Sequence, residues 1–243
     1  MLRFSKTQFV IISLVLATML GLSPIVMSAN NNDKSVETDT ILWFDDFESE
    51  TVKWLGVGSG SVTRSTSMAM NGDASLNITA RTWNNEEAQR QIGSPNYPLS
   101  IVTVDFWFSA PITGYEYFVF GLQYCSANRD VWYRSGIMLS GFYENETGQW
   151  TSIEGFPIGW DLSDNYRIWH HASLSVDLAN GAYITLTIDD YEFDLKSLGY
   201  KCHDRSVEGN PVLWGSVYPY FFAGAGESSC SILIDDVMLT SRK

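Results

Sequence analysis

The sequence predicts an all-β protein in which two antiparallel sheets pack face to face as a β-sandwich. Apolar residues recur at every second position in several segments after residue 40, which is the period of a half-buried strand. The chain also has 19 glycines and no convincing amphipathic helix of any length. Sheets with one apolar face must bury that face, and two facing sheets do so.

The alternation is clearest in residues 101–108, where apolar side chains share one face of the predicted strand and Thr103, Asp105 and Trp107 share the other. The predicted inward residues there are Val102, Val104, Phe106 and Phe108. The other alternating segments are residues 116–122, 131–140, 168–176, 183–188 and 231–239. Each is predicted to be a strand with one buried face.

Asn180-Gly181 separates two of these segments, residues 168–176 and 183–188. Both residue types tolerate a positive φ, so this dipeptide predicts a tight hairpin turn between antiparallel neighbours. Parity within the first strand places His170 inward and His171 outward. The two histidines are therefore not expected to bind one metal ion together.

The chain is strongly acidic, with 15 Lys+Arg against 28 Asp+Glu and a formal net charge of −13. It contains no run of Lys and Arg that could reverse this sign locally. Because a polyanion repels phosphate backbones, nucleic-acid binding is disfavoured.

Residues 1–29 read as a secretory signal peptide: Arg3 and Lys6 precede an apolar segment, and small residues follow it. An uncleaved anchor over residues 9–27 is the alternative, since that length is close to what spans a bilayer. Either reading predicts a secreted or cell-surface protein. Residues 30–39 are a polar lead-in, and residues 40–243 are expected to form a single domain.

Three stretches together resemble the LamG-like jelly rolls of the concanavalin A-like lectin/glucanase superfamily, including its carbohydrate-binding modules. They are the Trp-His hairpin of residues 167–190, the opening Trp-Phe-Asp-Asp-Phe-Glu-Ser at residues 43–49 and the ending of residues 232–239. Asp190 stands where the family usually has glycine. The resemblance implies a jelly-roll sandwich, but this superfamily includes lectins, hydrolases, lyases and structural domains, so fold does not define function.

Hydrolysis of a glycan requires two carboxylates that face one cleft. Hydrolases that the chain resembles carry Glu-x-Asp-x-x-Glu or Glu-x-Asp-x-Glu on one strand, and neither spacing occurs in this sequence. Adjacent acidic pairs such as Glu86-Glu87 point to opposite faces of a strand. The prediction is a noncatalytic module that binds a polysaccharide or glycan. The alternatives are a glycan hydrolase or lyase of the same fold, and a cell-surface adhesion protein whose partner is another protein.

The resemblance also implies a candidate structural calcium site, because jelly rolls of this kind often bind calcium where the first and last strands meet. Calcium prefers oxygen ligands, and carboxylates supply them. The candidate ligands are Asp45, Asp46, Asp235 and Asp236. The alternative is that these are ordinary strand-end acids exposed to water.

The candidate ligand-binding residues follow from strand parity. If the phenylalanines of residues 101–108 and 116–122 face the core, polar and aromatic side chains of neighbouring strands fall on the opposite face. They are Asp105, Trp107, Tyr117, Gln123, Trp132 and Arg134. Flat rings beside polar groups suit sugars, although sheets favour aromatic residues on any half-covered surface. Loop aromatics form the alternative platform, namely Trp83, Trp150, Trp160 and Trp214.

The three cysteines, Cys125, Cys202 and Cys230, permit at most one disulfide within the chain. Cys202 and Cys230 lie in the loop-rich last third and are the predicted pair, with Cys125 a small buried apolar residue. No Cys-x-x-Cys spacing occurs, so a cysteine zinc motif is not expected. The oligomeric state is left open.

Overall fold

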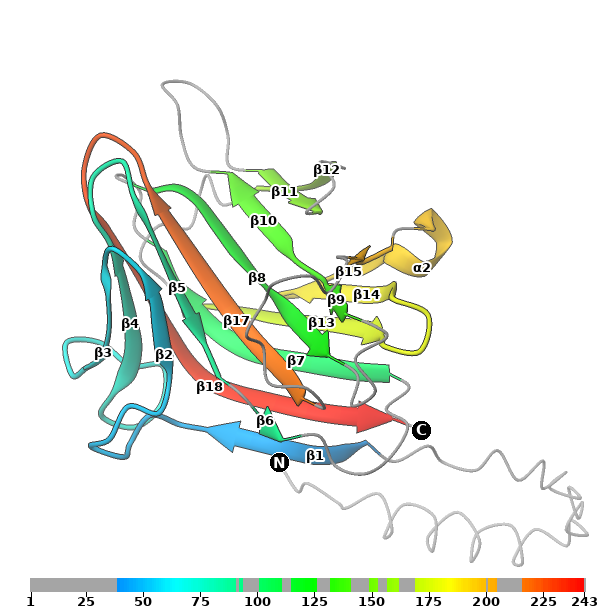
Figure 1. Ribbon diagram of the computed structural model, residues 1–243, viewed down its shortest axis with the longest axis horizontal. Helices are drawn as coiled ribbons and strands as arrows, with labels where there is room; N and C mark the ends of the chain where they lie inside the picture. Colours follow the sequence, from blue (N-terminus) through cyan, green and yellow to red (C-terminus); the bar gives the residue numbers. More distant parts are fainter. Residues whose placement is uncertain are drawn as a thin grey trace, which may run out of the picture. The chain divides into compact units, whose positions relative to one another are not determined.

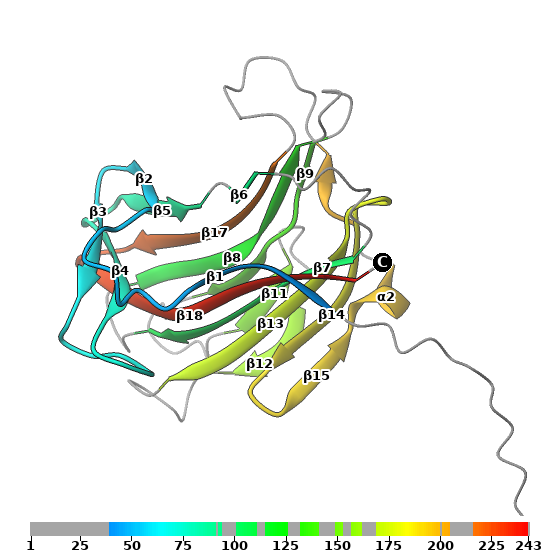
Figure 2. The ribbon, with the colours of Figure 1, turned by 90° about the horizontal axis from the view of Figure 1, so that it is seen from below.

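Two antiparallel sheets stack face to face, which confirms the predicted β-sandwich (Figures 1 and 2). The computed structural model describes residues 39–242 except for residues 91, 94–100, 111–114, 126–131, 141–148, 153–156, 162–168, 200 and 205–215. The described part belongs to one compact unit, Glu37–Lys243. The predicted signal peptide lies outside the described residues, and in the described part no helix is long and apolar enough to cross a bilayer.

We call the eight-stranded sheet sheet A; its order is β15-β14-β13-β7-β18-β4-β3, with β1 also paired to β18. The bounds of its strands are β1 (Thr40–Asp45), β3 (Ser61–Ser65), β4 (Ser75–Ala80), β7 (Ile101–Ser109), β13 (His170–Asp177), β14 (Ala182–Ile188), β15 (Tyr191–Asp194) and β18 (Cys230–Arg242). A single turn of helix, α2 (Leu195–Leu198), follows β15. The last strand, β18, pairs with the first strand, β1, as well as with β7, so the sheet brings together the two ends of the domain.

Sheet B has ten strands in the order β12-β11-β10-β8-β17-β5-β2, with the short strands β6, β9 and β16 attached beside this path. Their bounds are β2 (Leu55–Gly58), β5 (Asn85–Gln89), β6 (Ile92–Gly93), β8 (Tyr115–Cys125), β9 (Trp132–Arg134), β10 (Ile137–Ser140), β11 (Gln149–Ser152), β12 (Pro157–Asp161), β16 (His203–Asp204) and β17 (Ser216–Ala225). The centre of the sheet is the antiparallel pair β8 and β17.

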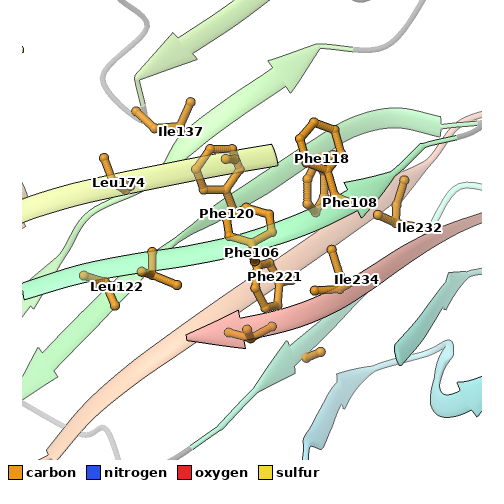
Figure 3. Packing of buried hydrophobic residues seen from close by; sticks show 14 of the residues in the cluster. Phe106, Phe108, Phe118, Phe120, Leu122, Ile137, Leu174, Phe221, Ile232 and Ile234 are labelled. Carbon is orange, nitrogen blue, oxygen red and sulfur yellow. The ribbon is translucent and has the colours of Figure 1, made fainter. Parts of the chain in front are cut away.

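Aromatic rings form the contact between the two sheets (Figure 3). Phe106 of sheet A lies with its ring centroid 4.8 Å from Phe120 and 4.7 Å from Phe221, both in sheet B. All three side chains are fully buried. Burying one such side chain stabilises the fold by about 1.5–3 kcal/mol, and edge-to-face ring pairs add about 0.5–1.5 kcal/mol. The predicted inward faces of residues 101–108 and 116–122 are therefore confirmed.

The predicted hairpin is also confirmed: β13 and β14 are antiparallel, and Gly181 in the connecting turn has a φ of 61°. His170 is buried and His171 is half-buried on the outer face, as parity predicts. The segment 131–140 differs from the prediction, because it divides into β9 and β10. Ser135 lies at the break, where its backbone N–H and its hydroxyl both donate to the carbonyl of Leu122.

The predicted disulfide between Cys202 and Cys230 is wrong, since the structure joins none of the three cysteines in a disulfide and buries all of them. Cys230 begins β18, and its thiol donates to the carbonyl of Gly224 at 3.7 Å instead of facing another sulfur. Burial raises the pKa of both Cys125 and Cys230 to about 11, so these thiols stay protonated at neutral pH. Cys125 is fully buried, as predicted.

The glycines of the segment 56–60 are explained by the buried carboxylate of Glu86. Glu86 accepts a 2.6 Å hydrogen bond from the backbone N–H of Gly60, and its oxygens lie 2.6 Å from where a Cβ at Gly56 would be and 2.8 Å from where one at Gly58 would be. At Gly60 itself, a Cβ would lie 1.8 Å from the carbonyl oxygen of Thr79. The segment from β2 to β3 can therefore lie this close to β4 and β5 only because positions 56, 58 and 60 are glycines.

We predict that Gly60→Ala destabilises the fold, because neither the Thr79 backbone nor Glu86 can easily move away from an added methyl group. Overpacking of this kind typically costs about 1–3 kcal/mol. Urea unfolding measures the change. Gly226→Ala is the matched control, since a Cβ there would meet nothing within 4 Å. Equal stability of the two variants would contradict this packing.

Candidate functional site

The six predicted ligand-binding residues do not lie on one face. Asp105 and Trp107 lie on β7 in sheet A, whereas Tyr117 and Gln123 lie on β8 in sheet B. The other two, Trp132 and Arg134, lie on β9, also in sheet B. Segments 101–108 and 116–122 follow each other in the sequence but belong to opposite sheets, so their outward faces point to opposite sides of the sandwich. The side chain of Trp132 lies outside the described residues.

On the outer face of sheet A, Asp105 and Trp107 both contact His171 of β13. The Nε2 atom of His171 lies 2.8 Å from Oδ1 of Asp105, and the ring centroids of His171 and Trp107 are 4.9 Å apart. The hydrogen bond to Asp105 and the charges of Asp105 and Asp189 outweigh burial and raise the pKa of His171. The three side chains therefore contact one another on this face, with His171 bonded to Asp105 and packed against Trp107.

The outer face of sheet B is built mainly from β5, β8, β9 and β17. Register places Tyr220 opposite Gly121 and Phe222 opposite Val119. Their neighbours on β17, Phe221 and Ala223, belong to the core, which confirms that the even-numbered residues 218–224 face outward. On β5 the outward residues are Glu87 and Gln89, opposite Phe222 and Tyr220.

Arg134 and Glu87 form an ion pair on this face. An Nη atom of Arg134 lies 3.1 Å from an oxygen of Glu87, and the side chains are only 20% and 11% exposed. The guanidinium group lies over the ring of Tyr220, with its central carbon 4.2 Å from the ring centroid. Cation–π contact of this kind adds to the ion pair.

The ion pair is held in a fixed orientation. Tyr220 is fully buried, and its hydroxyl donates a 2.7 Å hydrogen bond to the carbonyl of Ser135. Burial raises the pKa of Tyr220 to about 12, so the phenol is neutral. Burial also acts to lower the pKa of Arg134, but Tyr220 and Glu87 outweigh it and the net shift is upward. The Nε atom of Arg134 is buried and makes no hydrogen bond in the described structure.

Beside the ion pair lies an aromatic pair. The rings of Tyr117 and Phe222 are stacked, with an interplanar angle of 11° and centroids 5.5 Å apart. Both side chains are half-buried. Tyr117 lies directly over Gly224, where a Cβ would be 2.4 Å from the ring. Since Phe222 is opposite Glu87 in the β5–β17 register, the stacked rings and the ion pair form one continuous surface. We call this surface the sheet B platform, made of Glu87, Tyr117, Arg134 and Phe222 together with the buried Tyr220 that supports Arg134 from beneath.

Sequence reasoning identified Tyr117 and Arg134 but missed Glu87, Tyr220 and Phe222. The last two lie on β17, a strand that was not predicted. Its alternating residues Tyr218, Tyr220 and Phe222 carry the signal, but Pro219 interrupts the segment, and proline normally argues against a central strand. Gln123 lies on the same outer face but is buried.

The alternative loop platform is only partly described. Trp83 is 61% exposed, and its backbone has a φ of 57°, which is unusual for a bulky residue. Trp150 lies on β11 and Trp160 on β12, but their side chains, like the whole of Trp214, lie outside the described residues. Of this set, therefore, Trp83 is the one whose side chain the structure describes, and it is exposed.

The four acids of the predicted calcium site accept hydrogen bonds from N–H groups. Asp45 accepts from the backbone of Phe47 and from Nε1 of Trp54, and Asp46 accepts from the backbone of Glu48. Asp235 is fully buried and accepts from Met70, Asn71 and Asp236, and Asp236 accepts from the side chain of Asn71. Burial raises the pKa of Asp235 to about 6 despite these bonds.

The bonds of Asp45 and Asp46 stay close to the end of β1. Asp235 and Asp236 of the last strand hold the loop before β4 through Met70 and Asn71. Glu48, which was not among the predicted acids, accepts the backbone N–H groups of Asp73 and Ala74 in the same loop. Within the described ranges, no three His, Cys, Asp or Glu side chains are grouped as a metal site would require. The geometry accounts for the acids as loop anchors, and calcium at this junction stays a prediction.

A melting experiment tests the calcium prediction. If N–H donors alone hold these carboxylates as loop anchors, the melting temperature should be unchanged when a chelator is added, whereas a bound calcium ion predicts a fall. Calcium and magnesium additions after chelation are the controls. A midpoint that falls with chelator and recovers only with calcium would overturn the loop-anchor interpretation and establish the ion.

The raised pKa of His171 gives a second prediction. NMR titration of the ring should give a value above the usual 6.5, and Asp105→Asn should lower it; Glu227→Gln, an exposed acid elsewhere, should not. A folded-state pKa above the unfolded value stabilises the fold at low pH. That stabilisation is complete below about pH 6.5 and is lost as pH rises through the folded-state pKa. Equal His171 values in wild type and Asp105→Asn would refute the pairing.

No protein-family model and no curated protein matches the chain. Several solved structures are similar to it. The Bauhinia forficata lectin in complex with GalNAc is 11% identical, with 85% of this chain and 98% of that chain covered and a TM-score of 0.49. The CBM22-1 xylan-binding domain of Paenibacillus barcinonensis Xyn10C is 14% identical, with 86% and 99% covered and a TM-score of 0.43.

An endo-β-1,4-glucuronan lyase from Trichoderma reesei is 13% identical, with 82% of this chain and 95% of that chain covered and a TM-score of 0.47. The three proteins are a lectin, a xylan-binding domain and a lyase, so they do not share one activity. Likeness at this level carries no argument about function, which is therefore argued from the chain's own residues.

Proposed function

We propose that this protein is an exported, noncatalytic module that binds a polysaccharide or glycan on the sheet B platform. The observation that carries the proposal is the stacked pair Tyr117 and Phe222 beside the ion pair of Glu87 and Arg134. Sugar rings present flat C–H faces and a rim of hydroxyl groups. Aromatic faces suit the former, and oriented polar groups suit the latter.

The side chains of the platform are packed against one another without a ligand, which supports binding. Tyr117 is held between Gly224 and Phe222, and Arg134 is held by Glu87 and Tyr220. Side chains that are already ordered lose little conformational entropy on binding. Export is part of the proposal and rests on the signal-peptide pattern of residues 1–29.

The arrangement of carboxylates favours binding over hydrolysis. A glycosidase needs one carboxylic acid and one carboxylate across the scissile bond. Among the described side chains of the platform, the carboxylate is Glu87, and it is engaged with Arg134. Glu86, its neighbour in sequence, points the other way and is bonded to Gly60, as parity predicts for adjacent acids. Among the described side chains of this face, therefore, no two carboxylates lie as a glycosidase requires, whereas groups that can bind a sugar are present.

Affinity gel electrophoresis tests the proposal. Gels that contain soluble β-glucans, xylans, mannans or galactans should retard the wild-type protein for at least one polymer. Tyr117→Ala and Phe222→Ala should each weaken that binding about tenfold, the equivalent of about 1.4 kcal/mol. Gly224→Ala should weaken it too, because a methyl group there displaces the Tyr117 ring.

Two control variants locate the site. Trp107→Ala removes an aromatic ring from the opposite face of the sandwich, and Trp83→Ala removes the exposed loop ring; both should bind like wild type. Circular dichroism confirms that each variant is folded. Loss of binding in Trp83→Ala with normal binding in Tyr117→Ala would move the site to the loops. A folded wild-type protein that no glycan retards would refute the function.

A further inference from the structure

The sheet B platform has one positive and one negative side chain among its described residues, and the two neutralise each other. Arg134 contributes the positive charge and Glu87 the negative charge, at an N–O distance of 3.1 Å. The other described outward groups nearby are uncharged, namely Gln89, Tyr117, Gln123, Tyr220 and Phe222. Within the described structure, the platform therefore combines zero formal charge with several hydrogen-bonding groups.

A free arginine on such a surface would favour ligands that carry carboxylates, because its planar group of donors matches a carboxylate oxygen pair. Here one Nη atom already donates to Glu87, and one face of the guanidinium plane is covered by Tyr220. A second carboxylate that approached Arg134 would also approach Glu87, and like charges at short range repel. The net charge of −13 adds to that repulsion.

A neutral hydroxyl group meets no such repulsion. It can accept a hydrogen bond from the guanidinium group and donate one to Glu87, because a hydroxyl is both donor and acceptor.

We propose that the platform selects neutral glycans over glycans that contain uronic acids, and that Glu87 determines this specificity by compensating the charge of Arg134. The inference rests on the proposed glycan binding and concerns its ligand class. Glu87 orients Arg134 and also repels acidic sugars. A repulsive group that acts against the competing ligand is a common source of specificity.

Matched polymers provide the test. β-1,4-Mannan and β-1,4-mannuronan differ at C6, as do a soluble β-1,4-glucan and β-1,4-glucuronan. Titration calorimetry with oligosaccharides from each pair, using the whole folded protein, should give binding at least about tenfold tighter to the neutral member of the preferred pair. Glu87→Gln leaves the charge of Arg134 uncompensated and should reduce that ratio about tenfold or reverse it.

Glu192→Gln is the matched control. It removes the same charge from an exposed position on β15 in sheet A, so it changes the net charge without changing the platform, and its ratio should equal that of wild type. Salt provides a measurement that needs no variant. The neutral oligosaccharide carries no charge, so its affinity should be nearly independent of ionic strength, whereas repulsion of the uronic acid member should weaken as salt rises and the neutral preference should shrink.

The outcomes separate the two proposals. Absence of binding to every glycan refutes the function itself. Wild-type binding to the uronic acid member that equals or exceeds binding to its neutral partner overturns the specificity while the function stands. If Glu87→Gln prefers the neutral member as strongly as wild type does, the role of Glu87 is overturned. The same holds if Glu192→Gln loses this preference as much as Glu87→Gln does.

Discussion

The contact of Phe106 with Phe120 and Phe221 fixes how the two sheets stack, and the position of the candidate site depends on it. Side chains alternate along a strand, so burying Phe120 and Phe221 in the sandwich forces their neighbours Gly121, Tyr220 and Phe222 to the outer face of sheet B. A shift of one residue in either strand would bring polar groups into the core. Core packing thus determines which residues the solvent side presents.

The surface chemistry also depends on places where a side chain is missing. Tyr117 can lie flat beside Phe222 because Gly224 beneath it has no Cβ, and the backbone of Ser135 can approach β8 because Gly121 has none. That approach gives the Tyr220 hydroxyl its acceptor, and Tyr220 in turn supports Arg134. The platform is therefore a second packed layer on the outside of the sheet, ordered by the same close contacts as the core.

Local sequence patterns were sufficient for the fold class, the strands of residues 101–108 and 116–122 and the Asn180-Gly181 hairpin, because alternation and turn chemistry act over a few residues. They were insufficient for the site. Sheet membership is decided by pairings such as β8 with β17, whose residues are about a hundred positions apart, and such pairings leave no trace in a single sequence. The three cysteines illustrate the same limit, since proximity in the fold, not in the sequence, decides whether Cys202 and Cys230 meet.

The two outer faces now have distinct characters. Sheet A presents hydroxyl groups and the mutually satisfied cluster of Asp105, Trp107 and His171, whereas sheet B presents stacked rings and an oriented ion pair. A crystal structure with a bound neutral oligosaccharide distinguishes them most directly. The sugar ring should lie against Tyr117 and Phe222, with a hydroxyl group bonded to Arg134. A sugar found against Trp107 on sheet A would contradict this account.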